Sequence, residues 1–80
     1  MNPFSYLSSG YTSYINLRLE RIGRRIEELK EKRTEASELC QGYLGTDRAI
    51  TQMAEILVYS KKIRKLRKKR RGLERRLGDN

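Results

Sequence analysis

The chain has 80 residues, enough for one domain at most. Charged residues make up 36% of it and give a net charge of +9, and no apolar run approaches the roughly 20 residues that span a bilayer. One cysteine and no histidine exclude an intrachain disulfide framework, a cysteine–histidine zinc site and the usual general base of an enzyme. We therefore expect a non-catalytic protein without a cofactor or metal.

Residues 1–13 form an arm rich in serine and aromatic residues, with neither the basic n-region nor the apolar h-region of a signal peptide. We therefore expect a cytoplasmic protein. Two starts of the first helix remain open: Pro3 suits a first helical position, whereas Gly10 favours a later start capped by Thr12 or Ser13. Tyr6, Tyr11 and Tyr14 are expected either to cover the open end of a helical pair or to stack on unpaired bases.

The segment from residue 14 to 40 repeats every seven residues, with successive members four and three residues apart. This spacing predicts a long helix that packs against another along one stripe, here called the seam. Arginine 33 is the one charged member, and arginine can lay its stem on apolar surface while its head stays in water. The predicted seam of the first helix consists of Ile15, Leu19, Ile22, Ile26, Leu29, Arg33, Ala36 and Cys40.

A short break near residues 41–47 separates this helix from the next. Gly42 suits a left-handed helix end, and Thr46 or Asp47 can cap the following helix through a side-chain oxygen. Cys40, at the seam beside this turn, is interpreted as a small buried apolar residue, since nothing in the sequence supplies a base to activate it.

The second half of the chain shows the same repeat, which again predicts a helix with one apolar stripe. A short connection favours antiparallel packing of neighbouring helices. We therefore predict an all-α fold: an antiparallel helical hairpin over residues 14–77, made of two long coiled-coil-like helices and assembling into a dimeric bundle. The predicted seam of the second helix consists of Ile56, Tyr59, Ile63, Leu66, Arg70, Leu73 and Leu77.

Apolar residues beside the second seam predict an interface. Ile50, Met53, Leu57 and Val58, here called the apolar patch, are more than a lone hairpin needs and would be exposed together. The two interpretations are an intermolecular interface, which favours self-association, and a surface covered by the N-terminal arm folding back.

Residues 60–80 form a strongly basic helix end that carries the whole net charge, because residues 1–59 hold eight basic and eight acidic residues. Like charges three and four residues apart repel each other on a helix, so a compensating polyanion is expected. The alternative is a solvated cationic surface. The candidate nucleic-acid-binding residues, here called the basic run, are Lys61, Lys62, Arg64, Lys65, Arg67, Lys68, Lys69, Arg71, Arg75 and Arg76.

The basic run lacks side chains suited to reading base edges, which favours contact with the phosphate backbone and little dependence on sequence. An anionic membrane surface fits less well, because the helix lacks Trp and Phe and its apolar stripe is used by the seam. The alternative function is that of a protein-binding adaptor, a chaperone-like partner or an inhibitor that docks an acidic or helical surface. Glutamates of the first helix are expected to pair along it, Glu20 with Arg24 and Glu28 with Lys32.

Overall fold

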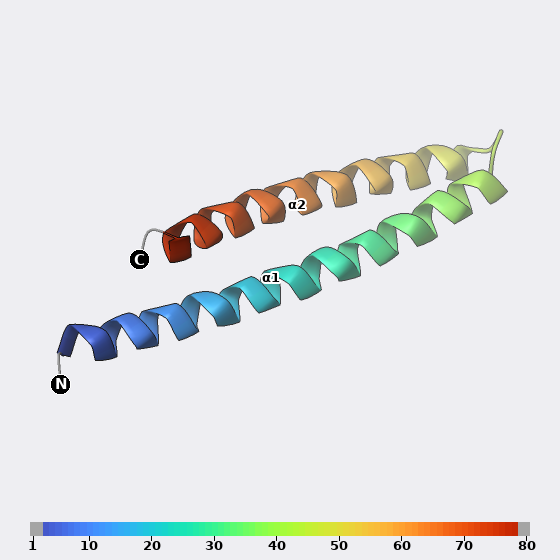
Figure 1. Cartoon of the computed structure of the whole chain (residues 1–80). Helices are drawn as coiled ribbons and strands as arrows, with labels where there is room; N and C mark the ends of the chain where they lie inside the picture. The colour runs from blue at the N-terminus through green and yellow to red at the C-terminus, as the bar shows by residue number, and fades with distance from the viewer. Residues whose placement is uncertain (1–2, 79–80) are drawn as a thin grey trace.

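The protein is an antiparallel pair of long helices, as the computed structural model shows for residues 3–78, with side chains described from residue 10 on. Helix α1 spans Pro3–Gly42 and helix α2 spans Asp47–Gly78, and they lie side by side over most of their length (Figure 1). The described chain measures 67 × 15 × 13 Å, so it is a rod. The predicted all-helical hairpin is confirmed, whereas its assembly into a dimer remains a prediction.

The seam holds the two helices together, as the heptad spacing predicts. Ile15, Ile26, Leu29 and Ile63 are each 1% exposed, and they share one cluster with Ile22 and Leu73. Four further members of the predicted seam pack on this cluster in partly buried positions: Leu19, Tyr59, Leu66 and Leu77. Burying side chains of this size stabilises a protein by about 1.5–3 kcal/mol each. Arg33 and Arg70 are half-buried at the edges of the seam.

The turn uses a different glycine from the one that the sequence predicts. Gly45, with φ of +85°, takes the left-handed conformation, whereas Gly42 is the last residue of α1 and has no positive φ. The expectation for Gly42 is therefore wrong, because the chain bends three residues later. Thr46 precedes α2 and its carbonyl accepts a hydrogen bond from the Ala49 N–H at 3.2 Å. Its hydroxyl donates back to the Tyr43 carbonyl at 2.6 Å and so closes the turn.

The first of the two starts considered for the first helix is the observed one. Helix α1 begins at Pro3 and passes through Gly10 without a break. Because α1 has 40 residues and α2 has 32, about eight residues of α1, roughly 12 Å, continue beyond the end of α2. Figure 1 shows this overhang at the N-terminal end of α1. The N-terminal segment therefore extends away from the apolar patch and does not fold back over it.

The interior differs between the two halves of the rod. We define the turn half as residues 27–62 and the open half as residues 3–26 and 63–78. Large buried side chains are concentrated in the open half, whereas two of the three buried residues of the turn half are Ala36 and Ala49. Cys40 is half-buried, not fully buried as expected, and its thiol donates to the Ala49 carbonyl at 3.7 Å. Small side chains line the seam near the turn.

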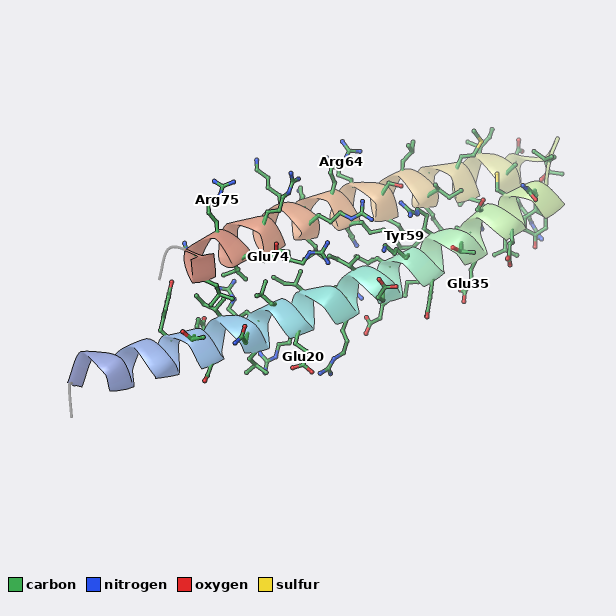
Figure 2. All side chains as sticks on the ribbon, in the orientation of Figure 1. Glu20, Glu35, Tyr59, Arg64, Glu74 and Arg75 are labelled. Atoms are coloured by element: carbon green, nitrogen blue, oxygen red, sulfur yellow. The ribbon has the colours of Figure 1, made fainter. Side chains whose placement is uncertain are left out.

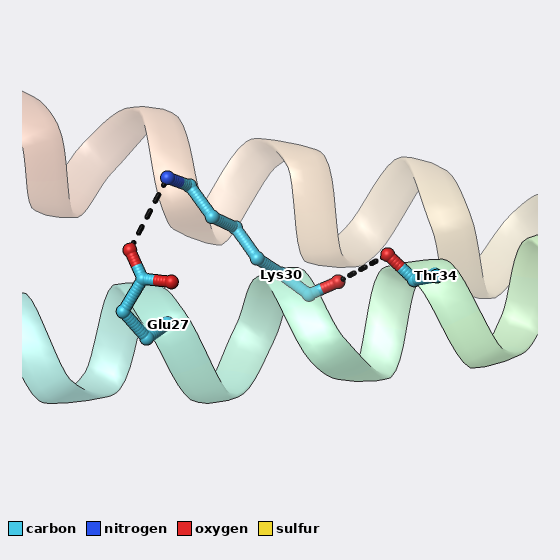
Figure 3. Close-up of polar contacts among 3 residues, drawn as sticks. All are labelled: Glu27, Lys30 and Thr34. Carbon is cyan, nitrogen blue, oxygen red and sulfur yellow. Dashed lines mark hydrogen bonds and ion pairs between the residues drawn. The ribbon is translucent and has the colours of Figure 1, made fainter.

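Pairs along α1 stabilise its outer surface. Arg24 binds Glu20 at 2.8 Å, as predicted, but Glu28 binds Arg25 at 3.1 Å, so its expected pairing with Lys32 is wrong. Lys30 binds Glu27 at 3.3 Å, and the Thr34 hydroxyl donates to the Lys30 carbonyl (Figure 3). Exposed pairs of this kind contribute only about 0.3–0.5 kcal/mol each.

Candidate nucleic-acid interface

Folding gathers positive charge from both helices into the open half. This half contains thirteen basic residues against Glu20 and Glu74, a net charge of +11. The turn half contains six basic and seven acidic residues, a net charge of −1. The sequence places all of the net charge after residue 59, whereas the hairpin adds the basic residues of α1 that lie opposite. Those residues are Arg18, Arg21, Arg24 and Arg25.

The basic run is exposed along its whole length. All ten of its side chains are solvent-exposed, and within residues 10–78 none of the ten lies within salt-bridge distance of a carboxylate. Glu74, the nearest acidic residue on α2, lies 3.9 Å from Arg70, which is outside the run. Figure 2 shows Arg64 and Arg75 pointing away from α1, while Glu20 and Glu35 point away from α2. The run is therefore available to an external anion.

Part of the basic run lines a groove between the helices. Two adjoining depressions share Lys69: one, of about 250 Å³, is lined by Arg18, Lys69, Gly72, Leu73 and Arg76. The other, of about 240 Å³, is lined by Arg25, Leu29, Lys62, Lys65, Leu66 and Lys69. Leucine side chains of the core form the apolar part of both linings. We call this feature the basic groove.

Another part of the basic run lies on the outer surface of α2, next to the groove. Lys68, Arg71 and Arg75 line a depression of about 350 Å³ on α2 alone, which shares Gly72 with the groove. Arg64 lies one heptad before Arg71 and so shares this face of the helix. We call these four residues the outer stripe. Eight of the ten residues predicted together are thus divided between two adjoining surfaces, and Lys61 and Arg67 line neither.

The basic groove includes two residues that sequence reasoning missed. Arg18 and Arg25 belong to α1, where they lie seven residues apart among balanced charges. Their spacing relative to the first seam would have placed them beside it, but only the handedness of the packing tells which flank of α2 they meet. Arg25 also forms an ion pair with Glu28. Arg18 lies over the Tyr14 ring, with 5.8 Å between its guanidinium carbon and the ring centroid.

The apolar patch is exposed in the turn half. Ile50 is 67% exposed, Met53 55%, Leu57 71% and Val58 49%. Leu44 at the turn is also exposed, at 72%. Ile50 and Leu57 share one heptad position of α2 with Arg64 and Arg71, so the outer face of α2 changes along its length from apolar to cationic. No described part of the chain covers the patch.

The described residues offer little for other chemistry. Residues 3–78 contain no group of three acidic, histidine or cysteine side chains that could hold a metal ion. Nor does either described helix have a stretch long and apolar enough to cross a bilayer. The basic run and the apolar patch are the most prominent cationic and apolar surfaces that the described residues expose.

The geometry defines a two-helix hairpin with a cationic open half. Neither a protein-family model, a curated protein nor a solved structure matches the chain significantly. The argument for function therefore comes from the charges and surfaces of this chain.

Proposed function

We propose that the protein binds nucleic acid through the phosphate backbone, with little dependence on base sequence. The observation that carries this proposal is the open half, with a net charge of +11 and eight exposed basic-run residues, none of which has an acidic partner within residues 10–78. Like charges at helical spacing destabilise α2 by a few tenths of a kcal/mol per pair. Phosphates relieve that repulsion, and release of their condensed counterions drives binding.

Indifference to base sequence follows from the composition of the run. Between Lys61 and Arg76 there is no Asn, Gln, Ser or Thr, so the run has no amide side chain to read adenine, and arginine and lysine, which can read guanine, are its main polar side chains. We propose that most of these lysines and arginines contact phosphates, which carry no direct sequence information. A binding site for a small anion needs several donors that point to one place. The cations of the basic run are instead spread along the helix, which suits an extended polyanion.

The test is a binding titration across salt concentrations with oligonucleotides of unrelated sequence. Each phosphate neutralised adds about 0.9 to the slope of log affinity against log salt, so even four to eight contacts give a slope of roughly −4 to −7. Affinities for different sequences of equal length are expected to agree within a few-fold. Absence of binding at about 50 mM salt would contradict the proposal, because counterion release is strongest at low salt.

The apolar patch supports a second element of the proposal, self-association. Two copies are proposed to pack their α2 helices antiparallel, with Ala54 facing Ala54 of the second copy. In that register Ile50 of one copy faces Val58 of the other, and Lys61 faces Asp47, which joins opposite charges at both ends. The two cationic open halves then lie at opposite ends of the assembly, where they repel each other least.

Leu57→Glu tests this arrangement, because it places a charge in the centre of the patch without touching the seam. The variant is expected to stay helical and to have about half the wild-type mass in light scattering. Leu17→Glu is a matched control, since Leu17 is an exposed leucine in the open half. A wild-type protein that is monomeric at high concentration would contradict self-association.

The alternative of a protein-binding adaptor rests on the same patch. In it, the patch docks a different protein and the basic run meets an acidic surface of that protein. A monomeric wild type that binds no oligonucleotide would favour this function over the first.

A further inference from the structure

The end of the basic groove that lies nearest the overhang carries exposed tyrosines. Tyr14 is 56% exposed and Tyr11 is 42% exposed. Helix α2 ends about opposite Tyr11, so it supplies no further turn to cover these rings. An aromatic ring with half its surface in water is open to another planar group.

Arg18 connects these rings with the groove. Its guanidinium lies over the Tyr14 ring at 5.8 Å, and the same residue lines the groove with Lys69 and Arg76. A group bound to Arg18, Lys69 and Arg76 would therefore lie within one side-chain length of Tyr14. Cations and an aromatic face thus meet at one place.

A second tyrosine–arginine pair shows that this pairing alone does not make such a site. At the turn, Arg48 lies over the Tyr43 ring at 5.4 Å, but Tyr43 is half-buried and the turn half has a net charge of −1. Only the Tyr14–Arg18 pair adjoins the groove between the described helices. The two pairs therefore form a natural comparison within one chain.

Resting on the proposed function, we infer that the basic groove takes single-stranded nucleic acid, with phosphates along the cations and a base stacked on Tyr14. Lys62 and Arg76 are separated by fourteen residues of α2, roughly 21 Å along the helix, which is long enough for several nucleotides. Stacking on aromatic rings beside a positive groove is the usual way to hold single strands without sequence preference. In a duplex the faces of the bases are stacked on one another, so they cannot stack on Tyr14.

The binding assay uses two single-stranded oligonucleotides of about 12 nucleotides, oligo(deoxythymidine) and oligo(uridine). It compares them with a duplex that has the same number of phosphates as each single strand. Wild-type protein is expected to bind the single strands more tightly than the duplex. Tyr14→Leu should weaken single-strand binding about 5- to 150-fold, the range for loss of one stacked base, and leave duplex binding unchanged. Tyr14→Phe keeps the ring and should keep the affinity. Tyr43→Leu, at the other pair, should have no effect on either ligand.

The groove is tested by charge-matched triple variants. Lys65→Gln, Lys69→Gln and Arg76→Gln together remove three charges from the groove, whereas Arg64→Gln, Lys68→Gln and Arg71→Gln remove three from the outer stripe. The groove triple should weaken single-strand binding at least tenfold more than the outer triple. Circular dichroism verifies that each variant is helical. Tyr14→Phe tests whether the ring is sufficient for binding, and this test does not depend on the folding of Tyr14→Leu.

The possible failures are distinguishable. Equal wild-type affinity for single strands and duplex, with no loss in Tyr14→Leu, would overturn the stacking inference and leave phosphate binding intact. Equal losses in the two triple variants would overturn the assignment of the groove. No binding of any oligonucleotide by the wild type would overturn both the inference and the proposed function.

Discussion

The turn half and the open half share one heptad repeat but place size and charge in opposite ways. In the open half, large residues such as Ile15, Ile63 and Leu73 are buried and the surface is cationic. In the turn half, Ala36 and Ala49 are buried, while Ile50 and Leu57 are exposed. The open half thus has a core of large side chains and a crowded cationic surface, whereas the turn half is nearly neutral and leaves four large apolar side chains of α2 exposed.

This difference is the reason that we propose different partners for the two halves. Phosphates would relieve the repulsion among the cations of the open half, and another apolar surface would cover the exposed apolar area of the turn half. An 80-residue chain has little core to spare, so both partners would add usefully to its stability. The predictions that follow separate the contributions of the two halves.

The largest effect is expected in the core of the open half. Ile63 is 1% exposed, and replacing a buried isoleucine by alanine costs about 2–5 kcal/mol because it removes buried area and leaves a cavity. Ile63→Ala should therefore lower the urea midpoint strongly. Val58→Ala, at a half-exposed position of α2, serves as the control and should change the midpoint of the dilute monomer little. Equal effects would contradict the packing described.

A smaller effect is expected from screening the open half. Raising salt from about 10 mM to 1 M shortens the Debye length from about 30 Å to 3 Å, so repulsion between the cations weakens. The Tm of the free protein should rise by several degrees, since about 1 kcal/mol shifts Tm by 4–8 °C in a domain of this size. The triple variant Lys65→Gln, Lys69→Gln and Arg76→Gln should show a smaller rise. A wild-type Tm that falls with salt would contradict this repulsion among the cations.

A local effect is expected at the turn, where two glycines give a matched pair. Gly45 has φ of +85°, so Gly45→Ala should destabilise the protein by about 1–2 kcal/mol. Gly42 ends α1 without a positive φ and has open space around its Cβ position, so Gly42→Ala should be neutral or stabilising by up to about 1 kcal/mol. Urea denaturation measures both, and the opposite order would place the bend at Gly42.

Most of the fold could be predicted from the sequence because the heptad spacing defines one apolar stripe per helix. Ile15, Ile26 and Ile63 lie in the core for this reason. The position of the bend could not be predicted, since Gly42 and Gly45 both permit it and only the closed turn selects the second. The partner of Glu28 could not be predicted either, because Arg25, three residues before it, and Lys32, four residues after it, can form ion pairs of similar energy.

The candidate site was predicted in part. Positions in the basic run follow from composition, and their exposure follows from their distance to the seam. The division of these residues into a groove and an outer stripe depends on which flank of α2 faces α1, and a heptad pattern alone does not specify that. Arg18 was added to the site by this packing, whereas Tyr14 was already one of the tyrosines considered for base stacking. The exposure of large apolar residues in the turn half could be predicted from the heptad pattern, since Ile50 and Leu57 lie outside the seam positions.

The measurement that tests the central claim most directly compares equal charge removal from the two halves. One variant carries Lys65→Gln, Lys69→Gln and Arg76→Gln in the open half, and the other carries Lys30→Gln, Lys32→Gln and Arg48→Gln in the turn half. If the open half binds phosphates, the first variant should lower the magnitude of the salt slope by up to about 2.7 on duplex DNA or about 2.1 on single strands, and the second should leave it close to the wild-type value. Equal changes in the two slopes would contradict the assignment of binding to the open half.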